Sequence, residues 1–251
     1  AILLLLVAAL GVSLYRLGDR GLWSAHEARA ARVARTMLRT GEWVVPQLAP
    51  GEPTYQKPPL YYWLVAGVSR VAGGKVTPWT TRLPSALAYV GIVLVAYGLG
   101  RELKGHRAGL LAGLAVMTSA RLMWTARVAV LDPLLTFWIA LALLLFLRAY
   151  RKDRLWPGAL SAFVPVGLGL LTKGLPALVV PGIVVGGYLL WEARVRWRKV
   201  CRVLGCCVAG LGVCVVIAAP WYVAVHTRTD GAFTDEFFVR HHLVRSGWIE
   251  A

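Results

Sequence analysis

Seven long apolar stretches limit what this chain can fold into more than any other feature of its sequence. They lie near residues 2–15, 82–103, 107–124, 133–150, 156–171, 175–191 and 203–225. A helix needs about 20 apolar residues to cross the hydrocarbon core of a bilayer. Because 58% of the residues are hydrophobic and only 16% are charged, an ordinary soluble domain is excluded. We therefore predict an all-α, polytopic membrane protein with about seven transmembrane helices.

The two ends of the chain predict that it is a piece of something longer. The first stretch is short and starts at Ala1 without a methionine, and the chain stops at Ala251 soon after the seventh stretch. A signal peptide is the weaker interpretation, because no basic region precedes the first stretch. We expect residues 1–251 to be the N-terminal part of one transmembrane domain whose C-terminal remainder is missing.

Basic residues gather in three short connections between the apolar stretches. Short loops rich in Lys and Arg mark the cytoplasmic side of a membrane protein. The three connections alternate along the chain and therefore share one side, which we assign as cytoplasmic. They contain Arg101, Lys104 and Arg107, then Arg148, Arg151, Lys152 and Arg154, and then Arg194, Arg196, Arg198, Lys199 and Arg202. These topology signals explain most of the net charge of +16, so we expect no nucleic-acid partner.

The other connections fall on the opposite, extracytoplasmic side. They are the long outer segment at about 16–81, the turn 127–133, the turn at Lys173 and Gly174, and the tail from His226. Almost no ionisable residue lies within the apolar stretches, and the main exception, Arg121, is near the outer end of its stretch. Ion pathways and proton-coupled transporters carry acids or bases at mid-membrane depth. The sequence therefore favours chemistry at the membrane surface over transport.

The long outer segment predicts two juxtamembrane helices. Ser24 and Glu27 form a capping-box pattern that starts the first helix. Its arginines fall on one face and its apolar residues on the other, which suits a helix lying along the membrane surface. The arginines are Arg29, Arg32, Arg35 and Arg39, and the apolar residues are Ala30, Val33, Ala34 and Met37. A second apolar run, 60–73, opens with prolines after Lys57 and is too short to span, so we expect a surface helix with an aromatic anchor.

Four polar residues on the outer side bear on whether this side carries a site. Glu27 could serve only its capping box. Asp132 precedes a proline and could cap the next helix, while Lys173 precedes a glycine and suits a helix C-terminus. Because the topology brings these three residues to the same side as Lys57, their joint presence favours a functional site.

Seven motifs follow one another along nearly the whole chain. They read WSAHEARAARVARTMLRTGEWVVPQL, YQKPPLYYW, TRLPSAL, AVLDPLLTF, TKGLPAL, PWYVAV and EFFVRHHLVR. In this order they resemble the polyprenyl-phosphate-dependent glycosyltransferases of the GT-C fold, particularly the aminoarabinose transferases and the protein O-mannosyltransferases. Several motifs in a fixed order are far more specific than any single one.

The resemblance implies a GT-C-type fold and a lipid-linked sugar donor, bound among membrane lipids at the extracytoplasmic face of the bacterial inner membrane. By position, Arg29, Lys57 and Lys173 are the donor-phosphate contacts, where fixed cations stabilise the charge of the leaving group. The sugar then passes, with inversion, to a lipid, glycan or protein acceptor. A hydroxyl acceptor needs a base, for which Asp132, Glu27 and His26 are the candidates, whereas a phosphate acceptor needs no strong base.

Two departures from the family pattern concern the base and a metal. Family members carry Asp where this chain has His26, so His26, Glu27 or Asp132 could take that role. They also carry a Glu that belongs to a divalent-metal site where this chain has Gln56, and a neutral amide is a poor ligand. A metal would then depend on His26, Glu27 or His242, which matches the histidine of the family's tail. Two other interpretations stay open: a polyprenyl-phosphate-binding carrier or transport protein, and an inactive GT-C scaffold.

Overall fold

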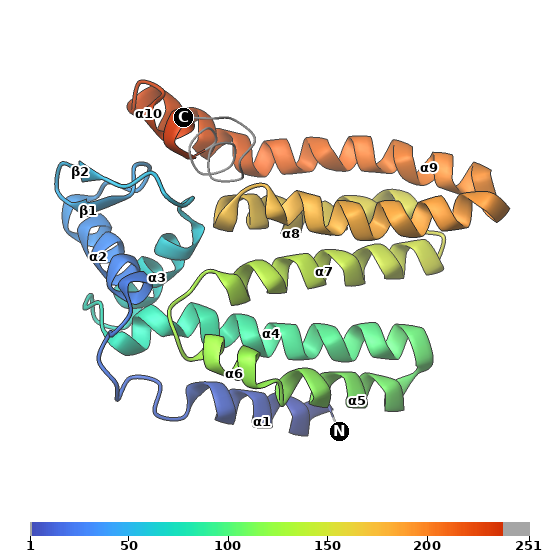
Figure 1. Ribbon diagram of the computed structural model, residues 1–251, viewed down its shortest axis with the longest axis horizontal. Helices are drawn as coiled ribbons and strands as arrows, with labels where there is room; N and C mark the ends of the chain where they lie inside the picture. Colours follow the sequence, from blue (N-terminus) through green and yellow to red (C-terminus); the bar gives the residue numbers. More distant parts are fainter. Residues whose placement is uncertain (1, 238–251) are drawn as a thin grey trace, which may run out of the picture.

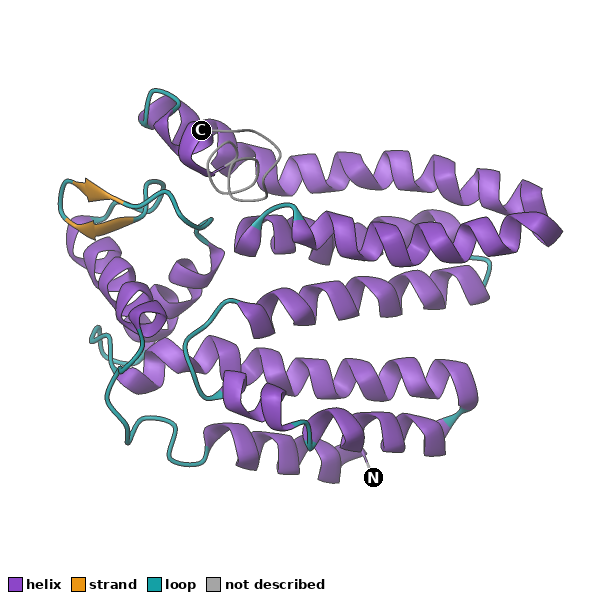
Figure 2. Ribbon diagram, viewed as in Figure 1, coloured by secondary structure: helices purple, strands orange, loops and turns teal. Residues whose placement is uncertain are grey.

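The computed structural model describes residues 2–237, without the side chains of residues 155, 157–159, 193–196 and 199. Helices dominate these residues, and their small sheet has two strands (Figure 2). The larger helices are α1 (Ile2–Leu14), α4 (Pro78–Lys104), α5 (His106–Met117), α7 (Asp132–Arg151), α8 (Leu155–Lys173) and α9 (Pro176–Arg228). The other elements are α2 (Ala25–Thr40), β1 (Gln47–Ala49), β2 (Glu52–Pro53), α3 (Leu60–Val71), α6 (Ala120–Ala126) and α10 (Ala232–Thr234). The predicted all-α class is confirmed.

The larger helices lie side by side as a bundle (Figure 1). α4 packs against α1, α5 and α7, and α8 packs against α7 and α9. The helical path of α9 turns back on itself (Figure 1). As a result, Leu189 packs in one cluster with Val200 and Val203. Both ends of α9 therefore lie near the end of the bundle that carries α2 and α3 (Figure 1).

The helices differ in whether they are long enough to cross a membrane. Among the described residues, α4, α7 and the Val200–Arg228 part of α9 are long and apolar enough. α5 and α6 together make a fourth candidate, but this pair is bent by 65°. Shorter apolar helices cover Ile2–Leu14, Leu160–Lys173 and Pro176–Glu192. The predicted apolar stretches are thus helical, while the prediction of one continuous helix over 107–124 is wrong.

The break between α5 and α6 lies at Thr118 and Ser119. The Thr118 hydroxyl donates to the carbonyl oxygens of Leu114, at 2.9 Å, and Ala115, at 3.3 Å. A hydroxyl that bonds these carbonyls competes with the backbone donors that would continue the helix. The chain leaves α5 at this point, and Arg121 lies in a separate short helix at the end of the bundle.

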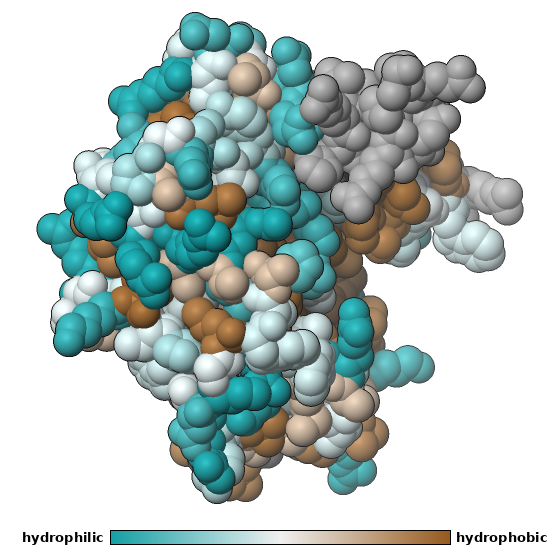
Figure 3. Space-filling model, turned by 60° about the vertical axis from the view of Figure 1, so that its left-hand side comes forward, coloured by the Kyte–Doolittle hydropathy of each residue, from teal (hydrophilic) through white to brown (hydrophobic). Residues whose placement is uncertain are grey.

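Large apolar side chains are exposed on the flank of the bundle. Ile183 is 69% exposed, Leu190 is 76% exposed and Val216 is 74% exposed. In Figure 3 the forward-facing end of the molecule is largely hydrophilic, whereas the part of the bundle visible behind it is largely hydrophobic. Apolar exposure on this scale suits contact with lipid, and it marks the protein as an integral membrane protein.

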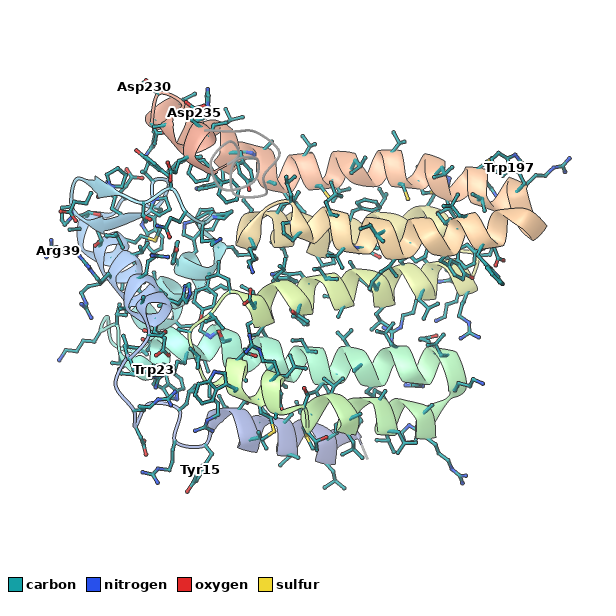
Figure 4. The ribbon with its side chains drawn as sticks, in the orientation of Figure 1. Tyr15, Trp23, Arg39, Trp197, Asp230 and Asp235 are labelled. Atoms are coloured by element: carbon teal, nitrogen blue, oxygen red, sulfur yellow. The ribbon has the colours of Figure 1, made fainter. Side chains whose placement is uncertain are left out.

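The outer segment 16–81 forms a cap on one end of the bundle (Figure 1). α2 begins after Ser24, whose hydroxyl accepts a hydrogen bond from the Glu27 N–H at 3.2 Å. The predicted apolar face of α2 is buried with α3, and Arg39 on the opposite face points away from the molecule (Figure 4). The ribbon of β1 and β2, which is antiparallel, was not predicted.

α3 forms where a surface helix was expected, but two of its aromatic residues are buried in the protein. Tyr61 and Tyr62 are buried in a core that α2, α3, α4 and α7 share. The Tyr61 hydroxyl donates to the Thr81 carbonyl at 3.1 Å and lies 2.8 Å from the Ser85 hydroxyl. Because these partners satisfy the phenol of Tyr61 inside the protein, and Tyr62 is buried as well, the two tyrosines do not supply the aromatic anchor that was expected for this helix.

The three basic connections lie together at the other end of the bundle. Arg148 Nε is 2.8 Å from Glu102 Oε1, and Arg202 is 3.8 Å from Asp153 Oδ1. Trp197, where α9 turns back, also lies at this end, far from Arg39 (Figure 4). The prediction that these connections share one side is confirmed.

Candidate active site

A cavity of about 400 Å³ lies at the capped end of the bundle. Its lining includes four residues that were predicted from the sequence: His26, Lys57, Asp132 and Lys173. They come from the start of α2, the segment before α3, the start of α7 and the end of α8. Residues far apart in the chain thus converge on one hollow that combines cations with a carboxylate.

Asp132 and Lys173 form an ion pair inside this cavity. Lys173 Nζ donates to Asp132 Oδ1, and the two side chains are 33% and 57% exposed, respectively. Asp132 is the first residue of α7 and Lys173 is the last residue of α8, so each charge is also favoured by its helix dipole. The alternative that Asp132 caps α7 is wrong, since Leu131 holds the cap position and no side chain makes a capping hydrogen bond.

Gly174 shapes the turn that carries Lys173 into the cavity. Its φ of 82° lies in the region that side-chain-bearing residues rarely adopt. A Cβ at this position would lie 2.8 Å from Cζ of Phe237. Glycine is therefore required both by the backbone conformation and by the close approach of a ring.

Aromatic residues on both sides of Lys57 fix the segment that carries it. Tyr55 packs edge-on against Phe233, with ring centroids 6.2 Å apart. After the prolines, Trp63 Nε1 donates to the Trp43 carbonyl at 2.8 Å, which ties the start of α3 to the segment before β1. These contacts connect the outer segment to α10 and set the position of Lys57 at the cavity wall.

Glu27, another predicted candidate, lies in a different environment. It is fully buried and pairs with Arg82 of α4, which is 1% exposed. Arg82 Nε lies 2.6 Å from Glu27 Oε1 and Nη2 lies 3.2 Å from Oε2. The remaining N–H groups of Arg82 donate to the carbonyls of Leu17, Arg20 and Gly21, at distances of 2.7 to 2.9 Å. All five guanidinium donors are thereby used.

Both oxygens of Glu27 also accept from the backbone. Oε1 accepts from the Ala129 N–H at 3.1 Å, and Oε2 accepts from the Trp23 N–H at 3.3 Å. Burial by itself raises the pKa of Glu27, but the hydrogen bonds and charge of Arg82 and the Ala129 N–H outweigh it, so the pKa is lowered. The carboxylate therefore stays ionised and joins α2, α4 and the loop that leads to Asp132.

This geometry favours a positioning role for Glu27. The predicted capping box is only half formed, since the Glu27 carboxylate turns to Trp23 and Arg82 and not to the Ser24 N–H. A buried carboxylate whose oxygens are already paired does not fit a metal ligand or a base. Within residues 2–237, no three His, Cys, Asp or Glu side chains form a group suited to a metal ion.

Arg29 and His242, the two remaining predicted residues, stand differently from those in the cavity. Arg29 does not belong to the described residues that line it. Burial raises the pKa of Tyr62 to about 12, and the charge of Arg29 opposes this rise, which places Arg29 near Tyr62. His242 lies outside the described residues, so its predicted metal role stays a prediction.

Arg121 and Arg82 were given no role from the sequence. Arg121 lines the cavity because the chain breaks after α5, and an unbroken helix pattern could not reveal this. Arg82 stands at the head of an apolar run in the motif TRLPSAL, and a lone arginine there was the available signal for a buried partner.

Comparison with protein families gives a match over almost all of this architecture. The model of the dolichyl-phosphate-mannose-protein mannosyltransferase family matches residues 1–232. The chain belongs to this family. A relative from Pseudomonas paraeruginosa, an undecaprenyl phosphate-alpha-4-amino-4-deoxy-L-arabinose arabinosyl transferase, is 33% identical over 96% of this chain and 43% of its own length. A relative of the same name from Pectobacterium atrosepticum is 32% identical over 91% of this chain and 40% of its own length.

Solved structures share the fold. ArnT from Cupriavidus metallidurans, crystallised with undecaprenyl phosphate, gives a TM-score of 0.84 at 26% identity, over 97% of this chain and 44% of that one. An oligosaccharyltransferase from Archaeoglobus fulgidus gives a TM-score of 0.66 at 15% identity, over 99% of this chain and 35% of that one, which speaks for the fold alone. The chain thus spans less than half the length of the proteins it matches.

Proposed function

We propose that this chain is the donor-binding part of a membrane glycosyltransferase that moves a sugar from a polyprenyl-phosphate donor to an acceptor. The observation that carries the proposal is the convergence of Lys57, Lys173 and Asp132 on one cavity at the end of an apolar bundle. Two fixed cations suit a lipid phosphate, and a carboxylate suits the acceptor's proton. The relatives named as arabinosyl transferases of undecaprenyl phosphate and the neighbour bound to undecaprenyl phosphate support this donor class.

The chemistry we propose is one displacement at the anomeric carbon, with inversion. An oxygen of the acceptor attacks this carbon while its bond to the donor's phosphate oxygen breaks, and the polyprenyl phosphate leaves with the bonding electrons. Lys57 and Lys173 stabilise the negative charge that develops on the phosphate. A hydroxyl acceptor on a lipid, glycan or protein passes its proton to Asp132, or to His26 in the first turn of α2. A phosphate acceptor needs no such transfer.

The Asp132–Lys173 ion pair suggests how donor binding prepares this step. In this pair each charge neutralises the other. A donor phosphate competes for Lys173, because a phosphate monoester or diester is as good a partner for an ammonium group as a carboxylate. Asp132 is then released to accept a proton. The donor would thereby activate its own base.

We further propose that the bundle crosses the membrane seven times and that the cavity is extracytoplasmic, in the bacterial inner membrane. The basic connections at the opposite end support this orientation. In a background without the four cysteines, Glu52→Cys should react with an impermeant thiol reagent added outside the cell, and Lys104→Cys should not. Both positions are exposed in the structure. The reverse labelling would invert the topology.

Transfer itself is tested with the full-length protein in liposomes, supplied with radiolabelled polyprenyl-phosphate sugars and a membrane extract. We expect Lys57→Ala to lose most of the transfer, and Asp132→Ala to lose most of it when the acceptor is a hydroxyl. Arg32→Ala, on the exposed face of α2, is the matched control and should keep it. Undiminished transfer in both the Lys57 and the Asp132 variant would show that this cavity is not the active site. Donor binding without transfer, for every sugar tried, would instead support the alternative of a polyprenyl-phosphate-binding carrier or an inactive scaffold.

A further inference from the structure

A second cavity, of about 390 Å³, lies beside the candidate active site. Trp124 lines both cavities and so stands between them. Four arginines line this second cavity: Arg16, Arg20, Arg82 and Arg127. Tyr15, which directly follows α1, lines it as well. The cavity therefore lies at the C-terminal end of this apolar helix.

The arginines of the second cavity carry more positive charge than their neighbours neutralise. Arg82 is paired with Glu27, and Arg16 is paired with Asp19. Arg20 and Arg127 form no ion pair with a carboxylate in the part of the chain that the structure describes. Two cations therefore face one hollow without a counter-charge among these residues. An anion that enters is attracted by both.

The two unneutralised guanidinium groups are held in place by other contacts. Arg20 lies over the rings of Trp23 and Trp124, with Cζ 5.2 Å and 5.7 Å from the ring centroids. The two tryptophans pack edge to face, with centroids 5.9 Å apart. Arg127 uses one Nη1–H to donate to the Val12 carbonyl at 2.9 Å. Each arginine thus has donors left over, and planar guanidinium groups held this way suit the oxygens of a phosphate.

The exposed face of α1 leads up to this cavity. Leu4 is 74% exposed, Val7 is 59% exposed and Tyr15 is 67% exposed. Their spacing places them along one side of the helix path. Figure 4 shows Tyr15 pointing outward from the bundle at the end of α1. An amphiphile with hydrocarbon along α1 would have its polar head at the arginines.

We propose that this second cavity binds the phosphate group of an anionic membrane lipid whose hydrocarbon lies along the exposed face of α1. This site is separate from the donor-phosphate contacts at Lys57 and Lys173. The apolar strip favours a lipid headgroup over free phosphate, because free phosphate gains nothing from Leu4 and Val7. The site does not depend on sugar transfer.

The test measures binding of dihexanoyl phosphatidic acid to the full-length protein in a phosphate-free sugar detergent. The donor contacts are first removed with Lys57→Gln and Lys173→Gln, so that the remaining binding reports the second cavity. In this background, adding Arg20→Gln and Arg127→Gln should weaken the affinity by at least about tenfold, since charge-assisted hydrogen bonds are lost. Adding Arg32→Gln and Arg39→Gln, which removes the same charge from the exposed face of α2, should leave it unchanged.

The single variant Arg20→Gln serves as the control for a folding defect. The Arg20 side chain is exposed and contacts the rings of Trp23 and Trp124, and its backbone carbonyl, which accepts from Arg82, is kept in the variant. Arg127, in contrast, ties α1 to the loop after α6. This single variant should keep the parent's melting temperature and still bind the lipid more weakly. Equal affinity in the Arg20 and Arg32 variants, or no binding once Lys57 and Lys173 are replaced, would overturn the proposal. Inorganic phosphate is the second probe. If it binds as tightly as the lipid, the hydrocarbon is not recognised and the lipid assignment is wrong.

Discussion

The Glu27–Arg82 and Asp132–Lys173 ion pairs lie at the same end of the bundle but differ in burial and in hydrogen bonding. The Glu27–Arg82 side chains are 0% and 1% exposed, and both are surrounded by backbone partners. The Asp132–Lys173 side chains are 57% and 33% exposed and face a cavity. A saturated, buried pair has no donor or acceptor left for a ligand, while an exposed pair can exchange its partner. The first pair therefore holds the cap together, and the second is available for chemistry.

The largest effect is expected from Glu27→Ala. It leaves the Arg82 guanidinium buried without its counter-charge, which typically costs about 3–5 kcal/mol of stability. Thermal unfolding of the purified protein in detergent measures the loss. Glu102→Ala breaks a half-buried pair at the other end of the bundle, whose partner Arg148 keeps access to solvent, and should cost less than about 1 kcal/mol. A Glu27→Ala protein that unfolds like the parent but does not transfer sugar would reassign Glu27 to the chemistry.

Asp132→Asn should act on the reaction and hardly on the fold. With a hydroxyl acceptor, we expect transfer to slow by about 100-fold, equivalent to about 2.7 kcal/mol in the barrier, because the proton acceptor is lost. Donor binding should stay equal or become tighter, since Lys173 no longer has a competing carboxylate. Single-turnover transfer and donor binding are measured separately. A parallel loss of both would mean that Asp132 acts only by positioning Lys173.

Lys57→Gln is expected to weaken donor binding by about tenfold, or about 1.4 kcal/mol, because one charge-assisted contact to the phosphate is lost. Equilibrium binding of a polyprenyl phosphate without sugar measures the contribution of the phosphate contact alone. Lys75→Gln, an exposed lysine of the same outer segment, is the charge-matched control. If both variants bind alike, the cavity attracts the donor only through its overall charge.

The smallest effect is the pH dependence of stability that arises from Glu27. Its pKa in the folded protein is lowered below the unfolded value of about 4.3, so the stabilisation is present above that pH and is lost as the pH falls through the folded pKa. One such group changes stability by at most about 1.4 kcal/mol per pH unit. Between about pH 5 and 3, the melting temperature of the parent should fall more steeply with decreasing pH than that of Glu27→Gln. Parallel curves would remove Glu27 as the source.

Local sequence patterns anticipated much of the fold. The apolar stretches became helices, the basic connections met at one end, and α2 began after Ser24 with its apolar face buried. The gathering of Lys57, Asp132 and Lys173 also followed from the sequence, because alternating crossings place every second connection on one side. Each of these inferences depends on residue type and on spacing within a segment.

Other features depend on contacts between distant segments. Glu27 and Arg82 are 55 positions apart, and no local pattern pairs them. The tyrosines of α3 are buried because α2 and α4 cover them, and Arg121 reaches the cavity because the helix breaks at Thr118.

Hydrophobicity and loop charge set the all-helical class, the number of apolar stretches and the face on which polar residues collect, because each follows from transfer of single segments between water and lipid. Only the packed structure assigned one carboxylate to a sealed ion pair and the other to an open cavity, because burial is a property of the surroundings and not of the residue.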